Sequence, residues 1–244
     1  FKDKGGFHQS EIAVFGTIII SFFALLINFF FPLDKILNTI IFFIPVFFFL
    51  KYKLILKKDL LFIFYSSILI FLVIAYSNIN TPDAGLYHLP YTQILNENKI
   101  ILGLSNLHFR FGHVSIIQYL SAINYNHING LEGILIPLAS LIVYIFLYFI
   151  NEIYQLKKSN FNITTNQLFC LCVVCYISYK INRYSGFGND AIAHMLMFYL
   201  ISIFFKSEFN YHYLQKTSII SLFIFLNKVT LLLAFLFPLI VFFK

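Results

Sequence analysis

The chain has 244 residues, of which 60% are hydrophobic and only 11% are charged, and its formal net charge is +7. A water-soluble domain has about 25% charged residues, so this composition argues against a soluble globule and favours an integral membrane protein. The basic residues sit at the ends of apolar stretches and form no patch on one face, which argues against a nucleic-acid-binding protein. We therefore expect the lipid bilayer, and no nucleic acid, among the partners of the chain.

About six or seven long apolar stretches divide the sequence. A bilayer requires roughly 17–25 apolar residues per crossing, and backbone groups in lipid must be satisfied within the segment, so these stretches predict helices. The predicted fold class is an all-α integral membrane protein, a polytopic bundle of transmembrane helices. The expected spans are Ile12–Phe31, Ile36–Leu50, Leu61–Tyr76, Ile134–Ile150, Gln167–Tyr179, Ala191–Phe205 and Ser218–Phe243, the last interrupted by Asn227 and Lys228.

Lysines mark the orientation of these spans. If the spans alternate in direction, four groups of lysines fall on one side, which the positive-inside rule assigns to the cytoplasm. These groups are Lys2 and Lys4; Lys51, Lys53, Lys57 and Lys58; Lys157 and Lys158; and Lys206 and Lys216. We expect a protein of the bacterial cytoplasmic membrane whose polar loops face outward.

One long loop, residues 77–132, lies on the predicted extracytoplasmic side. Apolar residues at helical spacing predict two short amphipathic helices within it, Gly85–Asn98 and Gly112–Tyr125. Both are too short and too polar to span a bilayer, so we expect them to lie along the interface. Residues 1–244 are read as a single transmembrane domain, and we expect it to be a fragment of a longer protein.

Polar residues that could carry chemistry gather at the predicted outer ends. Asp83 follows the third span, where it could cap a helix or act as a general base. Arg110 could anchor a lipid headgroup or clamp a phosphate, and His108 beside it has a structural or acceptor-contacting role. Asp190 and His194 are one helical turn apart on the sixth span, so they share a face.

Two further cations complete this set of candidates. Arg183 precedes the sixth span on the same outer side as Asp83. Lys228 interrupts the last apolar stretch, where a lone cation costs about 2.5–3.5 kcal/mol at mid-helix. It either snorkels to the interface or lines a cavity and pairs with a phosphate. Because these spans end at one interface, we expect Asp83 and Asp190 to share a pocket with Arg183 and Lys228.

The chain resembles the GT-C superfamily of multi-pass glycosyltransferases, in its branch of uncharacterised bacterial membrane proteins. The resemblance covers roughly residue 60 onward. It rests on the stretch from Asp83 to Pro90, on Glu97, on the segment with Asn106, His108, Arg110 and Gly112, and on Gly188-Asn189-Asp190 and Asn227-Lys228-Val229-Thr230. Many members carry two acids close together in the first outer loop, whereas here Ala84 and Gly85 follow Asp83.

This resemblance implies an enzyme that transfers a sugar from a polyprenyl-phosphate carrier to an acceptor outside the cytoplasmic membrane. By this resemblance, Asp83 would be the catalytic base. Because Asp190 is predicted on the same side, it would orient the acceptor or hold a divalent metal ion with Asp83, and that ion is the candidate cofactor. His88, His108, Arg110, Arg183, His194 and Lys228 are the candidate substrate-binding residues. Two alternatives stay open, a multi-pass transporter and a polysaccharide polymerase or ligase that uses a lipid-linked donor.

Overall fold

The computed structural model describes residues 8–52, 57–77, 82–112, 115–155, 163–184, 188–206 and 211–243. All regular structure in these ranges is helical, which confirms the all-α class. The long helices are α1 (Gln9–Phe30), α2 (Lys35–Tyr52), α3 (Lys57–Ala75), α6 (Ile136–Tyr154), α7 (Thr165–Tyr179), α9 (Asn189–Lys206) and α10 (Tyr211–Asn227). Shorter helices are η1 (Ala84–His88), α4 (Leu89–Glu97), η2 (Leu104–Asn106), η3 (Phe109–Gly112), α5 (Ile116–Ile123), η4 (Gly130–Ile134), α8 (Ile181–Tyr184), η6 (Val229–Phe235) and α11 (Leu236–Phe243).

The expected spans correspond closely to these long helices, and two of the helix starts carry capping boxes. His8 caps α1 while Glu11 accepts from the His8 backbone N–H, and Thr164 and Gln167 make the same reciprocal pair at α7. A capping box satisfies backbone N–H groups that the first helical turn leaves open. In the described part of the chain, α1 and α6, with 22 and 19 residues, are long and apolar enough to cross a membrane, and four further apolar helices are shorter.

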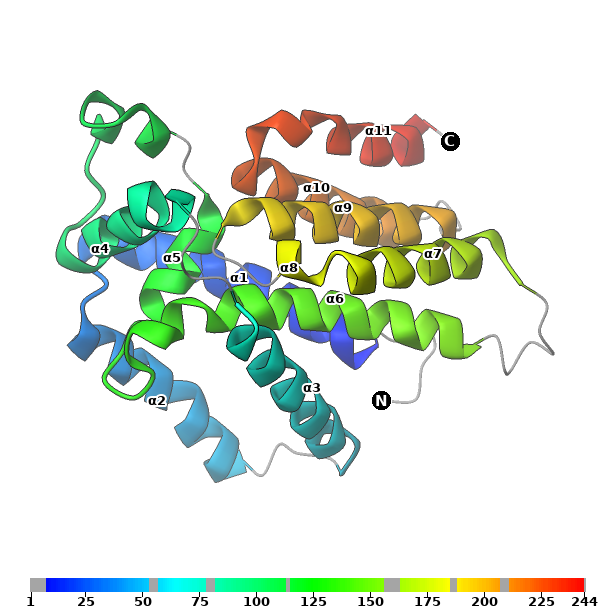
Figure 1. Cartoon of the computed structure of the whole chain (residues 1–244), viewed down its shortest axis with the longest axis horizontal. Helices are drawn as coiled ribbons and strands as arrows, with labels where there is room; N and C mark the ends of the chain where they lie inside the picture. The colour runs from blue at the N-terminus through cyan, green and yellow to red at the C-terminus, as the bar shows by residue number, and fades with distance from the viewer. Residues whose placement is uncertain are drawn as a thin grey trace.

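The last apolar stretch, Ser218–Phe243, is interrupted at Asn227 and Lys228, as the sequence predicts. The helix ends at Asn227, and the chain then turns back so that η6 and α11 pack along α10 (Figure 1). The Ser221 hydroxyl donates to the backbone oxygen of Ala234 across this hairpin, at 2.9 Å. The reversal follows from Lys228, whose extended backbone (φ −151°, ψ 99°) cannot continue a helix.

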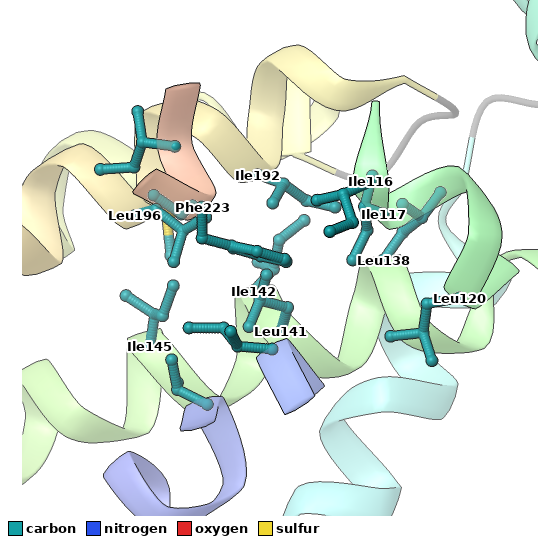
Figure 2. Packing of buried hydrophobic residues seen from close by; sticks show 14 of the residues in the cluster. Ile116, Ile117, Leu120, Leu138, Leu141, Ile142, Ile145, Ile192, Leu196 and Phe223 are labelled. Atoms are coloured by element: carbon teal, nitrogen blue, oxygen red, sulfur yellow. The ribbon is translucent and has the colours of Figure 1, made fainter. Parts of the chain in front are cut away.

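The core lies where α5, α6, α9 and α10 meet. Figure 2 shows Ile117 of α5, Ile142 of α6, Ile192 of α9 and Phe223 of α10 in one apolar cluster. Every residue of α5 is buried. The expectation that this helix lies along an interface, with its polar face in water, is therefore wrong. Its polar residues contact other buried groups inside the protein instead.

Buried asparagines fix the segment from η1 to α5 to the bundle. Asn96 of α4 donates to the backbone oxygens of Leu33 and Ala122, and Asn38 of α2 donates to Ala122 and Tyr125. A buried amide that bonds to backbone carbonyls of two or three segments holds them in one register. These contacts place η1, α4 and α5 at one end of the bundle, at the left of Figure 1.

Ion pairs lie at the opposite end. Lys216 at the start of α10 pairs with Glu11 at the start of α1, and Lys206 at the end of α9 pairs with Glu152 at the end of α6. The four helix ends that these pairs join are therefore at one end of the bundle, as alternating helices require. Lys206 and Lys216 belong to the lysines that the sequence places together on one side.

Candidate functional site

A cavity of about 550 Å³ opens at the end of the bundle that carries η1, α4 and α5. Five separate segments line it: η1 with the start of α4, the η3 turn, α5, the start of α9, and the break after α10. The lining residues are Asp83, Tyr87, His88, Tyr91, Arg110, Phe111, Gln118, Gly188, Asn189, Asp190, Asn227, Lys228, Val229 and Thr230. The prediction that Asp83 and Asp190 share a pocket with Lys228 is confirmed.

Asp83 is exposed at the start of a π-helical turn, η1, and its side chain makes no capping hydrogen bond. The wider π turn is closed by the Leu89 N–H, which donates to the Ala84 oxygen. Because a π turn has more residues than an α turn, both Tyr87 and His88 come round to the face of Asp83. The carboxylate therefore faces the cavity together with two side chains that can donate hydrogen bonds.

Tyr87 connects Asp83 to Arg110. Burial, and then the charge of Asp83, raise the pKa of Tyr87, so its hydroxyl stays protonated and donates to that carboxylate. The Arg110 guanidinium carbon lies 4.9 Å from the centre of the Tyr87 ring, and Nη1 donates weakly to the hydroxyl at 3.5 Å. A cation over an aromatic ring is attracted to its face. Tyr87 thus positions one acid and one cation of the cavity.

His88, the last residue of η1, packs against α5 and the start of α9. Its Nδ1 lies 3.1 Å from Gln118 Nε2, and its ring lies 4.2 Å from that of Tyr87. Burial lowers the pKa of His88 more than the nearby Asp83 and Asp190 raise it, so the imidazole is neutral at pH 7. If Gln118 donates to Nδ1, Nε2 carries the proton and can donate to a ligand.

Gly188 allows the close approach of His88. Its φ of +131° is a conformation that residues with a side chain rarely adopt, and a Cβ there would lie 3.2 Å from His88 Nε2. The glycine therefore lets the start of α9 pack against the imidazole, and the charge of nearby Asp190 acts on the ring.

Asp190 and Lys228 form an ion pair, with Nζ 2.7 Å from Oδ1. The Lys228 side chain is 28% exposed and that of Asp190 is 67% exposed. Lys228 therefore lines a cavity, which is one of the two positions that the sequence left open for it, and its partner there is the carboxylate of Asp190. Asp190 lies in the first turn of α9, where a negative charge is also favoured by the helix dipole.

Asn227 holds the chain break in place. This buried side chain accepts from Ser115 Oγ at 2.8 Å and from the Ile117 N–H at 3.0 Å, at the start of α5. Its amide donates to the Phe223 oxygen one turn back in α10. Ser115 does not cap α5 with its own side chain, so Asn227 does so from another helix. This contact fixes Lys228 relative to α5.

The other predicted site residues do not line the cavity or are not placed. His108 stacks on Phe109 and accepts from the Arg110 N–H at 3.3 Å, and its structural or acceptor-contacting role stays a prediction. His194, one turn along α9 from Asp190, is half-buried and away from the cavity wall. The side chain of Arg183 lies outside the described part of the structure, so the prediction that it joins the pocket stays a prediction.

The sequence did not single out Tyr91, Phe111 or Gln118 as parts of the site. Gln118 is a polar residue on a helix whose other residues are mostly apolar, and that contrast was the available signal. In the residues that the structure describes, no group of three or more His, Cys, Asp or Glu side chains could hold a metal ion. Asp83 and Asp190 are the carboxylates that would hold a divalent ion in this cavity.

The comparisons with known proteins identify a family and no activity. Residues 1–244 match the family described as Domain of unknown function (DUF8201), and the chain therefore belongs to that family. No curated protein and no solved structure matches the chain.

Proposed function

We propose that this member of the DUF8201 family is an integral membrane glycosyltransferase. It transfers a sugar from a polyprenyl-phosphate donor to an acceptor on the extracytoplasmic side of the bacterial cytoplasmic membrane. The observation that carries the proposal is one cavity that joins an exposed carboxylate, Asp83, to two cations, Arg110 and Lys228. That set matches the needs of a reaction in which a hydroxyl attacks and a phosphate departs.

Exposed apolar side chains support the membrane location. Helices α1, α2, α3 and α11 present large hydrophobic residues outward, such as Phe30 (66% exposed), Phe47 (60%), Phe71 (70%) and Phe243 (80%). A soluble monomer rarely exposes contiguous apolar patches of this extent. In a bilayer the same faces contact lipid, and the cavity lies at the end of the bundle away from the pairs Glu11–Lys216 and Glu152–Lys206.

The proposed reaction balances with the groups that line the cavity. Asp83 takes the proton of the acceptor hydroxyl while the acceptor oxygen forms a bond to the anomeric carbon of the sugar. The bond from that carbon to the phosphate oxygen breaks, and its electron pair leaves with the carrier phosphate. Arg110 and Lys228 stabilise the charge on this leaving group. Attack opposite to the departing phosphate gives inversion at the anomeric carbon.

Transfer by the Asp83→Asn variant tests the proposal. Purified protein in liposomes is given a panel of radiolabelled sugars on polyprenyl phosphate, and the release of free carrier phosphate is followed. Loss of a general base lowers the rate by about 10²–10⁴-fold. Glu132→Gln removes a carboxylate that is exposed and outside the cavity, and it should keep full activity.

Two outcomes would contradict the proposal. Undiminished transfer by Asp83→Asn, at normal protein levels, would remove Asp83 from the reaction. Ion or solute flux through the liposomes without any transfer would favour a transporter, which the helix break at Lys228 would also suit. The length of the product separates transfer of single sugars from polymerisation on a lipid-linked donor.

A further inference from the structure

The Asp190–Lys228 pair is uneven in its access to water. The side chain of Asp190 is 67% exposed, whereas that of Lys228 is 28% exposed. If the pair separates, the more exposed Asp190 side chain is more readily hydrated than that of Lys228. The ammonium group, on a side chain that lines the cavity, is then available to another anion.

The backbone of Lys228 is held in place by the fold. The Lys228 N–H donates to the Ile224 oxygen and the Leu231 N–H donates to the Lys228 oxygen, both within 3.0 Å. Asn227 beside it is bound to the start of α5. Among the described residues, the Asp190 carboxylate accepts from Lys228. The backbone of Lys228 is therefore fixed in the cavity wall, and the Asp190 carboxylate lies at the mouth of the cavity, where it can turn toward water.

We infer that Asp190 acts as a tethered anion that pairs with Lys228 and that a phosphate group displaces it. The inference rests on the proposed function, since it takes the cavity to be a phosphate site, and it assigns Asp190 a role other than catalysis or metal binding. Arg110, held over Tyr87 in the same cavity, is the second cation that contacts the incoming group.

The charge of the ligand decides when the exchange occurs. A sugar-bearing polyprenyl phosphate is a diester with one negative charge, whereas the departing carrier is a monoester with a charge of about −1.5 to −2 at pH 7. The diester has the same charge as the Asp190 carboxylate, so the two compete equally for Lys228. The monoester has a larger negative charge and therefore attracts Lys228 more strongly than the carboxylate does. Lys228 thus passes from Asp190 to the phosphate as the bond to the sugar breaks, which favours the transition state over the bound donor.

Binding measurements test this exchange without a transfer assay. Calorimetry on the purified protein in detergent uses two probes, inorganic phosphate and farnesyl phosphate. We expect Asp190→Asn to bind both about fivefold more tightly than the unaltered protein, since an ion pair of this exposure contributes a factor of that size. Glu132→Gln, which removes a carboxylate outside the cavity, should leave both affinities unchanged. Tighter binding of farnesyl phosphate than of inorganic phosphate identifies a lipid-borne ligand, and equal binding identifies free phosphate.

A double substitution separates displacement from simple repulsion. Lys228→Met should weaken binding, and adding Asp190→Asn to it should restore little, because the carboxylate then has no cation to withhold. An equal gain from Asp190→Asn in both backgrounds would overturn the inference, and so would weaker binding by Asp190→Asn alone, the result for a metal ligand. If the binding results hold while no sugar is transferred, the anion site stands and the proposed function fails.

Discussion

Gly188 is the residue at which the cavity wall least tolerates a side chain. A methyl group there would lie 3.2 Å from His88 Nε2, on a backbone with φ +131°. We expect Gly188→Ala to lower the free energy of unfolding by about 1–3 kcal/mol, because the strain and the contact act together. The matched control is Gly16→Ala in α1, where the added Cβ meets nothing within 4 Å.

Thermal unfolding in detergent compares the two glycine variants. Alanine stabilises the interior of a helix relative to glycine by about 0.5–1 kcal/mol, so Gly16→Ala should melt at or above the temperature of the unaltered protein. Equal melting temperatures for Gly188→Ala and Gly16→Ala would show that the start of α9 adapts without strain.

His88 makes stability depend on pH. Burial lowers its pKa below the usual 6.5. As the pH falls, His88 is therefore protonated near pH 6.5 in the unfolded chain and only at a lower pH in the folded chain. The contribution of His88 to the free energy of unfolding is therefore complete above pH 6.5 and is lost as the pH falls through the folded pKa. Replacing the group with one that does not titrate removes this loss.

Melting temperatures at a series of pH values between about 8 and 5 check this sign. We expect His88→Gln to lose less stability than the unaltered protein over the acid part of that range. Taking the difference between the two proteins cancels the titration of the other groups. A parallel decline for both proteins, or a steeper one for His88→Gln, would mean that His88 is readily protonated in the folded state.

At the scale of helices, the hairpin of α10 and α11 depends on Asn227. Its side chain is 6% exposed and makes hydrogen bonds to Ser115, Ile117 and Phe223. We expect Asn227→Ala to lower the free energy of unfolding by about 2–3 kcal/mol, because it leaves the Ile117 N–H and the Ser115 hydroxyl buried without that acceptor. It should also weaken phosphate binding by displacing Lys228.

The control for this variant is Asn98→Ala. Asn98 is exposed, and its amide donates to the Ile94 oxygen over a long 3.4 Å contact. An exposed substitution of this kind changes stability by about 0.5 kcal/mol or less. Chemical denaturation of both variants gives the comparison. Similar losses for Asn98→Ala and Asn227→Ala would contradict the capping role of Asn227.

Elements that depend on a continuous stretch of sequence could be predicted, whereas elements that depend on contacts between distant residues could not. Continuous apolar stretches located the long helices, since each helix satisfies its own backbone. The reversal at Lys228 was not predicted, because it depends on a contact between Asn227 and the start of α5, 110 residues away in the chain. The burial of α5 was missed for a similar reason. Its Gln118 pairs with His88 instead of facing water. The spacing of apolar and polar residues in the sequence does not show whether a polar side chain contacts water or a buried polar group.

At the scale of the whole molecule, the sidedness of the lysines anticipated which helix ends meet. Asp83 and Asp190 are more than a hundred residues apart, yet alternating helices bring both to one end, and they line one cavity. The sequence could not identify the group that pairs with Lys228, because several acidic residues and the phosphate of a ligand were all candidates. Arg183 remains a candidate by sequence alone.

The proposed function requires a cavity that faces outward, because a donor on the outer surface of the membrane can reach only such a cavity. Cysteine labelling in intact cells measures the direction of the cavity most directly, in a variant whose own Cys170, Cys172 and Cys175 are replaced by alanine. Ser105 and Thr165 are both exposed and lie toward opposite ends of the bundle. We predict that Ser105→Cys reacts with a membrane-impermeant maleimide in intact cells and that Thr165→Cys reacts only after permeabilisation. Labelling of Thr165→Cys, but not of Ser105→Cys, in intact cells would contradict the account, since the cavity would then face the cytoplasm.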